Sequence, residues 1–143
     1  MNSRRKAREA ALQFLFSLDV QGFPPVDLLP ALVEEFLAER PLEKKSHAFA
    51  LKLIEGVSRH RVQIDNELTS LLANFQLHRL GVVDRSLLRL ALFEIRFSED
   101  VPPVVVINEA IEIAKKFGAE ESARFINGVL DHAIASCSRN PRG

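Results

Sequence analysis

The sequence predicts an all-α fold of about seven helices in a single compact domain. Apolar residues recur at the three- and four-residue spacing of amphipathic helices in successive stretches, and prolines and glycines separate these stretches. A chain of 143 residues has the size of one domain. We therefore expect one domain over residues 1–143, with flexible ends at 1–3 and 138–143.

The first four helices are predicted from apolar spacing and from the residues that interrupt it. Residues 4–20 form the first expected helix, whose inward side chains are Ala7, Ala11, Phe14, Leu15 and Leu18. Asp27 is expected to cap a second helix over residues 27–39, which Pro41 stops. The third and fourth are expected over residues 43–60 and 62–75.

The last three helices follow the same logic. The stretch LLRLALFEIRF, residues 87–97, is apolar nearly all round, which indicates a central helix covered on several sides. Asp84 or Ser86 is expected to cap it, and Arg85, Arg89 and Arg96 are expected to keep one edge in water. The sixth begins behind Pro102 and Pro103 and ends at Gly118, where positive φ is expected, and the seventh follows.

Composition limits the function classes. Formal net charge is zero, the lone Cys137 has no disulfide partner, and no secretory leader opens the chain, so a reducing cytoplasm is expected. No apolar run is long enough to span a membrane. The histidines lack metal-ligand spacing, and phosphate-binding loops, dinucleotide loops and nucleophile elbows are absent from the sequence. We expect no enzyme, no cofactor and no metal.

Basic residues cluster at the start of the chain. Arg4, Arg5, Lys6 and Arg8 precede the first acidic residue, Glu9. Several cations within a short reach can neutralise phosphates, so the segment is a candidate nucleic-acid contact. A solubilising, partly frayed terminus is the alternative.

Phe125 lies away from the apolar stripe of the seventh helix, which is centred on Ile126. An aromatic ring there can stack on a base of single-stranded RNA, and the neighbouring Asn127 can contact a base edge. A phenylalanine at the rim of the core is the alternative. Gly128 in mid-helix indicates a close backbone approach, either to another helix or to a ligand.

The first helix has a second apolar edge. Leu12 and Phe16 lie away from its core stripe, where an exposed aromatic side chain can anchor a protein partner. Burial between two halves of the same domain is the alternative.

Several blocks together resemble the NusB family of bacterial transcription antitermination factors. The resemblance covers nearly the whole chain and is most specific in its last three blocks. The blocks are RRKAREAALQFLF, FALKLIEGV, RLGVVDRSLLRLALFEI, VPPVVVINEAIEIAKKFG and FINGVLD.

The resemblance implies two three-helix bundles in one compact body. It implies binding of boxA RNA from ribosomal RNA operon leaders together with ribosomal protein S10 (NusE), within the RNA polymerase antitermination complex. It places RNA on Arg4, Arg5, Lys6, Arg8 and Phe125 as one site, with Glu121 tuning affinity through its charge. It places S10 near Phe16 and Asp84.

Two other functions stay open at the level of sequence. A similar helical domain accompanies some RNA methyltransferases, so a detached accessory module is one alternative. A structural dimerisation module is another, and a homodimer is possible in either case. Phe75 and Phe16 also stand where many family members carry Trp and Tyr, so Phe16 lacks a hydroxyl that could contact the partner.

Overall fold

The computed structural model describes residues 3–135, which form an all-α domain of seven α-helices and two short 3-10 turns. The prediction of fold class and helix number is therefore confirmed. The α-helices are α1 (Ser3–Gln21), α2 (Leu29–Ala38), α3 (Lys44–Arg59), α4 (Arg61–Leu71), α5 (Val82–Phe97), α6 (Pro103–Phe117) and α7 (Ser122–Ala135). The 3-10 turns are η1 (Val26–Leu28) and η2 (Leu77–Arg79). The expected flexible residues 1–2 and 138–143 lie outside the described part, whereas Ser3 is the first residue of α1.

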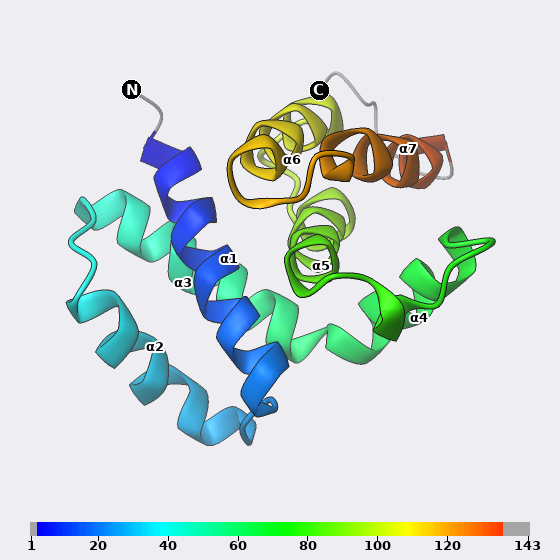
Figure 1. The fold of residues 1–143 in the computed structure, drawn as a ribbon. Helices are drawn as coiled ribbons and strands as arrows, with labels where there is room; N and C mark the ends of the chain where they lie inside the picture. Colours follow the sequence, from blue (N-terminus) through cyan, green and yellow to red (C-terminus); the bar gives the residue numbers. More distant parts are fainter. Residues whose placement is uncertain (1–2, 136–143) are drawn as a thin grey trace.

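The helices form two groups, and α5 joins them because it contacts both. Helices α1, α2 and α3 pack together, and α5, α6 and α7 form the second group, as Figure 1 shows. Helix α4 follows α3 and packs on α5 and α7. Because α5 also contacts α1 and α3, its side chains are covered on several sides, as its nearly all-apolar sequence predicts.

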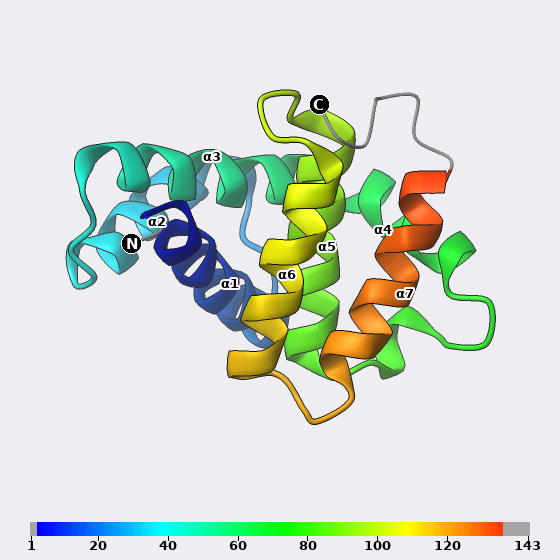
Figure 2. The same cartoon turned by 90° about the horizontal axis from the view of Figure 1, so that it is seen from above.

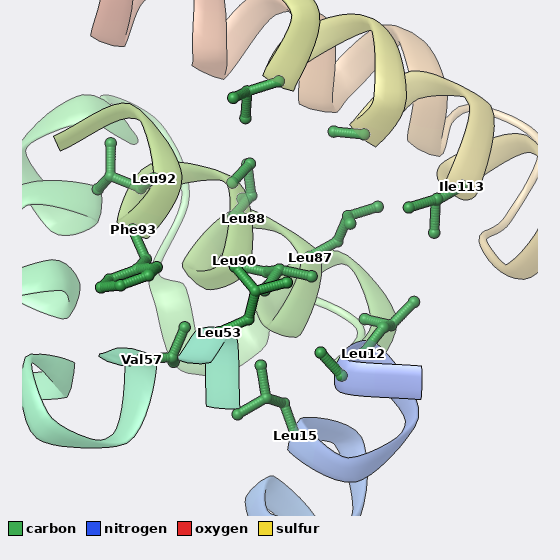
Figure 3. Close-up of a cluster of buried hydrophobic side chains, with 14 of the residues drawn as sticks. Leu12, Leu15, Leu53, Val57, Leu87, Leu88, Leu90, Leu92, Phe93 and Ile113 are labelled. Carbon is green, nitrogen blue, oxygen red and sulfur yellow. The ribbon is translucent and has the colours of Figure 1, made fainter. Parts of the chain in front are cut away.

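The core lies where α1, α3, α5 and α6 meet. Figure 3 shows this cluster, with side chains from all four helices converging on α5. Close packing of α3 on α5 requires glycine at position 56. A Cβ there would lie 2.1 Å from Cζ of Phe93, far inside van der Waals contact.

Several helix boundaries differ from the predicted ones. Helix α5 begins at Val82 behind Gly81, so Asp84 lies in its first turn and caps nothing, and neither does Ser86. Asp27 lies in η1, and α2 begins at Leu29 with Pro30 in its first turn. Helix α4 ends at Leu71, four residues before the expected end. Apolar periodicity indicates a helix but does not locate its terminal turn, where the backbone hydrogen bonds decide the boundary.

Gly118 ends α6 with φ of −92°, so the predicted positive φ is wrong. Glycine is required there for space, since a Cβ would lie 2.7 Å from the side chain of Ser122. The prediction of a wet arginine edge on α5 is also wrong. Arg85 and Arg89 bind carboxylates of α1 and α4, and Arg96 binds Glu67, so long cationic side chains on a buried helix are held by partner charges.

Candidate nucleic-acid interface

The basic start forms the first turns of α1, and its four cations have different environments. Arg4 and Lys6 are exposed. The Arg4 guanidinium lies 4.6 Å from the ring centroid of Phe49 and 3.4 Å from Oδ2 of Asp100. Exposed cations held on a helix present fixed charge to solvent, and fixed positive charge is what a polyanion needs. The segment is helical from Ser3 onward and is not frayed. The alternative that its charge only aids solubility stays a prediction.

Arg8 does not face solvent. Its side chain is 4% exposed, and its Nε and Nη2 donate hydrogen bonds of 2.7 and 2.8 Å to the carboxylate of Glu94 on α5. The prediction that Arg8 contacts RNA from a solvated terminus is therefore corrected, because the guanidinium is committed to a buried carboxylate. Its position on the inner face of α1 explains the error, since sequence periodicity alone does not show that a charged side chain has a buried partner.

Arg5 is intermediate between these cases. Its Nε and Nη2 donate hydrogen bonds of 2.8 and 2.9 Å to Glu109 on α6, and its side chain is 37% exposed. These hydrogen bonds, opposed by burial, hold the pKa of Glu109 below its ordinary value. One edge of Arg5 therefore fixes α1 on α6, while another edge is open to solvent.

Phe125 is half-buried on α7 and lines a groove of about 310 Å³ between α7 and the chain that follows α4. Its ring meets that of Phe75 edge to face, with centroids 5.4 Å apart and planes at 76°. Phe75 is 57% exposed. Phe125 therefore packs on the rim of the core, as one prediction had it, and it also borders an open groove, which the RNA-stacking prediction requires.

Gly128 borders the same groove, and no helix approaches it. A Cβ built at this position would meet nothing within 4 Å. Of the two explanations offered for a mid-helix glycine, the helix contact is therefore wrong. Asn127 is half-buried and Glu121 is exposed in the turn before α7, but neither lines this groove.

The structure keeps Phe125 apart from the basic start, because α6 lies between α1 and α7 (Figure 2). The C-terminal end of α6 also carries cations beside α1. Lys115 and Lys116 are exposed there, and Nζ of Lys116 lies 3.1 Å from Oε1 of Glu9 on α1. These lysines were not predicted as RNA contacts, although two adjacent cations close to a helix-ending glycine are visible in the sequence.

The residues expected to bind a protein partner also differ in their exposure. Phe16 is 40% exposed near the C-terminal end of α1. Leu12 is 2% exposed and belongs to the core in Figure 3. The prediction of Leu12 as a partner anchor is corrected, because its side chain is buried in the core and cannot reach a partner. Asp84 is half-buried in the first turn of α5.

Phe16 and Asp84 belong to helices that an arginine network joins. Asp19 lies one turn after Phe16 and accepts hydrogen bonds from Arg85 and Arg89 of α5. Burial tends to raise the pKa of Asp19, but these hydrogen bonds outweigh it and the pKa lies below its ordinary value. Arg89 also binds Asp65 of α4 through 2.8 and 3.0 Å hydrogen bonds. The surface that carries Phe16 is thus fixed to the head of α5.

Comparison with known proteins assigns the family. The NusB family model matches residues 5–135. The chain belongs to the NusB family. This confirms the resemblance found in the sequence, and the match spans every helix described above.

Similar NusB proteins cover most of the chain. The transcription antitermination protein NusB of Desulfitobacterium hafniense is 47% identical over 96% of this chain and 91% of its own length. A structure of Thermotoga maritima NusB has 38% identity and a TM-score of 0.85, covering 95% of this chain and 93% of that one. A crystal structure of antitermination factors NusB and NusE with double-stranded RNA has 30% identity and a TM-score of 0.80, covering 95% and 98% of the two chains.

Two further properties bear on what this NusB-family chain can bind. Among residues 3–135, no group of three or more histidine, cysteine or carboxylate side chains is arranged to hold a metal ion. In the same range, no helix combines the length and apolar character needed to cross a membrane. The chemistry that the described residues offer is a set of exposed cations, half-exposed aromatic rings and an apolar edge.

Proposed function

We propose that this NusB-family antitermination factor binds boxA-type single-stranded RNA together with ribosomal protein S10 (NusE). One observation carries the proposal. Over 95% of its length the chain is similar to a NusB whose crystal structure also contains NusE and double-stranded RNA. That complex supports RNA and NusE as partners, and the preference for a single strand is argued from the aromatic side chains below. The surface features of this chain support each half of the proposal separately.

Exposed cations support RNA binding. Arg4, Lys6 and the outer edge of Arg5 supply positive charge on α1, and Lys116 continues it at the end of α6. Arg124 is exposed beside the groove that Phe125 lines. Phosphate contacts of this kind give affinity but little sequence selectivity.

Aromatic side chains support a single-stranded substrate. Bases in a duplex are already stacked, whereas unpaired bases can stack on Phe125 and Phe75. Asn127, two residues further along α7, can contact a base edge if RNA crosses this end of the helix. Glu121 is exposed near Phe125 and would weaken RNA binding by like-charge repulsion, so it is assigned a tuning role.

The edge of α1 supports a protein partner. Phe16 is exposed although it is a large aromatic residue, and the exposed Val20 lies one turn further along the helix. An exposed aromatic with apolar neighbours is typical of interface anchors. Asp84 offers a negative charge on the neighbouring helix, where it can pair with a basic residue of S10.

The proposal places the protein in the cytoplasm, within the RNA polymerase antitermination complex, because that is where leader RNA is transcribed. We also propose that the free protein can form a homodimer in which the RNA surface is covered. In sedimentation experiments, we expect added RNA to convert this storage dimer into a monomeric protein–RNA complex. A dimer that binds RNA without dissociating would remove the storage role.

Electrophoretic mobility shift tests the function directly. Wild-type protein is titrated into boxA RNA, a scrambled single strand of the same composition, and a boxA duplex, each with and without S10. We expect the single-stranded boxA RNA to bind most tightly and S10 to increase its affinity. Equal affinity for scrambled RNA with S10 present contradicts the proposal.

The same experiment distinguishes the alternatives. An accessory module of an RNA methyltransferase would bind RNA without any effect of S10. A structural dimerisation module would bind none of the three RNAs. Tight binding of the duplex instead of the single strand would assign the groove beside Phe125 to something other than base stacking.

A further inference from the structure

Helix α3 carries a row of exposed cations that the proposed function does not use. Lys45, Lys52 and Arg59 are all exposed and are spaced seven residues apart. Residues at this spacing lie on one face of a helix, so the row covers about 21 Å along its axis. Most rows of surface charge only keep a helix soluble, so further observations are needed to assign a ligand.

The first such observation is that the row lines a continuous depression. One groove of about 390 Å³ is bordered by Arg4, Lys45 and Lys52. A second, of about 480 Å³, is bordered by Lys52 and Arg59 and shares Ala48 and Lys52 with the first. We call these two adjoining grooves the α3 groove. All three cations of the row therefore border it, together with one cation of α1.

The second observation is that cations from two helices already converge on an anion in this groove. Asp100, in the turn between α5 and α6, lies 3.4 Å from Nη2 of Arg4 through Oδ2 and 3.8 Å from Nζ of Lys52 through Oδ1. Its carboxylate oxygens stand where phosphate oxygens would be held between the same two side chains. A hydrogen bond from Ser98, opposed by burial, holds the pKa of Asp100 below its ordinary value, with Lys52 and Arg4 contributing.

The third observation concerns the far end of the groove. His60 stacks on Phe97 with ring centroids 4.1 Å apart and planes at 13°, and both residues line the groove beside Arg59. Aromatic surface next to a cation suits an unpaired base that follows the phosphates. Each half of the α3 groove also contains one carboxylate, which is Glu55 beside Arg59 and Asp100 beside Arg4.

We propose that single-stranded RNA flanking the boxA element continues from Arg4 along α3, with its phosphates in the α3 groove. Arg4 belongs both to the basic start and to the groove, so the RNA path is continuous. RNA is favoured over an acidic protein segment because the groove is continuous through Arg4 with the basic start that the proposed function assigns to RNA, and because its far end offers an aromatic surface to a base. The inference rests on the proposed RNA-binding function and extends it to a second surface.

Matched charge variants test the inference. Lys45→Gln/Lys52→Gln removes two groove cations, and Lys44→Gln/Arg79→Gln removes two exposed cations that do not border the groove. Anisotropy titrations use a minimal boxA RNA and the same RNA extended by unpaired nucleotides at either end. Removing two phosphate contacts should lower the logarithmic salt slope of the extended RNA by about 1.4. The control variant should keep the wild-type slope, and both should bind the minimal RNA alike.

A gain-of-affinity variant separates the inference from damage to the fold. Asp100→Asn removes the carboxylate that competes with phosphate, so extended RNA should bind up to about fivefold more tightly at low salt. Arg59→Gln should weaken only RNA long enough to reach the far end of the groove. Melting temperatures of all variants are measured alongside.

The outcomes separate this inference from the proposed function. In one outcome, wild type binds minimal boxA RNA while the affinity gained by extending the RNA is the same in wild type and in Lys45→Gln/Lys52→Gln. In that case the α3 groove does not bind RNA, and the proposed function stands. Equal losses in the groove and control variants also overturn the inference, as does loss of S10 binding with RNA binding unchanged. If wild type binds no RNA at all, both fail.

Discussion

Arg8 of α1 and Glu94 of α5 form a buried bidentate ion pair with hydrogen bonds of 2.7 and 2.8 Å. Their side chains are only 4% and 1% exposed. Bidentate guanidinium–carboxylate geometry satisfies several polar atoms at once, and this offsets the cost of taking both charges out of water. The pair fixes the basic start of α1 against the central helix, while Arg4 and Lys6 of the same segment remain exposed.

Breaking this pair should destabilise the protein strongly. Arg8→Ala leaves the Glu94 carboxylate buried without its main partner, and we expect the free energy of unfolding to fall by about 3–5 kcal/mol. Arg8→Met combined with Glu94→Leu should recover most of the loss, because no uncompensated charge is then buried. Urea denaturation measures both variants. Loss of less than about 1 kcal/mol in Arg8→Ala would show that the pair is open to water.

Arg4 and Lys6 should affect RNA binding without affecting stability. The double variant Arg4→Gln/Lys6→Gln removes two exposed charges, so the logarithmic salt slope for minimal boxA RNA should fall by about 1.4. Its melting temperature should match that of wild type, since exposed side chains contribute little to folding. Lys44→Gln/Arg79→Gln, which removes two exposed cations on other elements, is the control. An unchanged slope would remove the basic start from the RNA surface.

Phe125 should contribute more to RNA binding than its position at the core rim implies. Phe125→Ala removes a stacking surface, and we expect a loss of about 1–3 kcal/mol in boxA affinity. The stability loss should be below the 3–5 kcal/mol typical of a fully buried phenylalanine. Titration and thermal melts of the same protein samples give the two numbers. A stability loss in that upper range with unchanged RNA affinity would assign Phe125 to the core alone.

Gly128→Ala offers a substitution in the same groove with the opposite effect on folding. Because its Cβ meets nothing within 4 Å, the helix should be stabilised by about 0.8–1 kcal/mol. RNA affinity should fall if RNA approaches this backbone closely, as a mid-helix glycine indicates. A stabilised variant with wild-type affinity would show that RNA passes further from α7.

Phe16 should couple the partner to the RNA. Phe16→Ala should weaken S10 binding by more than about 1 kcal/mol and leave the affinity for RNA alone unchanged. Linkage requires that S10 tighten RNA binding by the same factor by which RNA tightens S10 binding. Titration calorimetry in both orders measures the two factors, with the exposed Val62→Ala on α4 as the control. Equal RNA affinity with and without saturating S10 would rule out the coupling.

Asp19 should give the protein an acid-sensitive contribution to stability. Its pKa is depressed in the folded state, so this contribution is present above the ordinary value of 3.8 and is lost as pH falls through the lower folded value. Asp19→Asn should therefore be less stable than wild type near neutral pH, and the gap should close below pH 3.8. Denaturation curves across this range measure the gap. Glu35→Gln, at an exposed carboxylate, serves as the control, and a gap for Asp19→Asn that is constant with pH contradicts the assignment.

The sequence by itself determined the all-α class, the number of helices, the central place of α5 and the family. These follow from local properties, because helical periodicity, prolines and glycines act over a few residues, and the family blocks can be recognised along the chain. The positions of Phe16 and Phe125 off the core stripes were also visible in the sequence, although their burial was not.

Only the tertiary structure decided which charged and apolar residues are available to a ligand. Arg4 and Arg8 are equivalent in a basic run, yet Glu94 lies 86 residues away in sequence and buries only Arg8. Leu12 and Phe16 share one helix edge, yet Leu12 is 2% exposed and Phe16 is 40% exposed. The same holds for the α3 groove, where Arg4, Lys52 and Asp100 meet from three distant segments. Burial and charge pairing depend on contacts between segments far apart in the chain, which periodicity within one helix does not record.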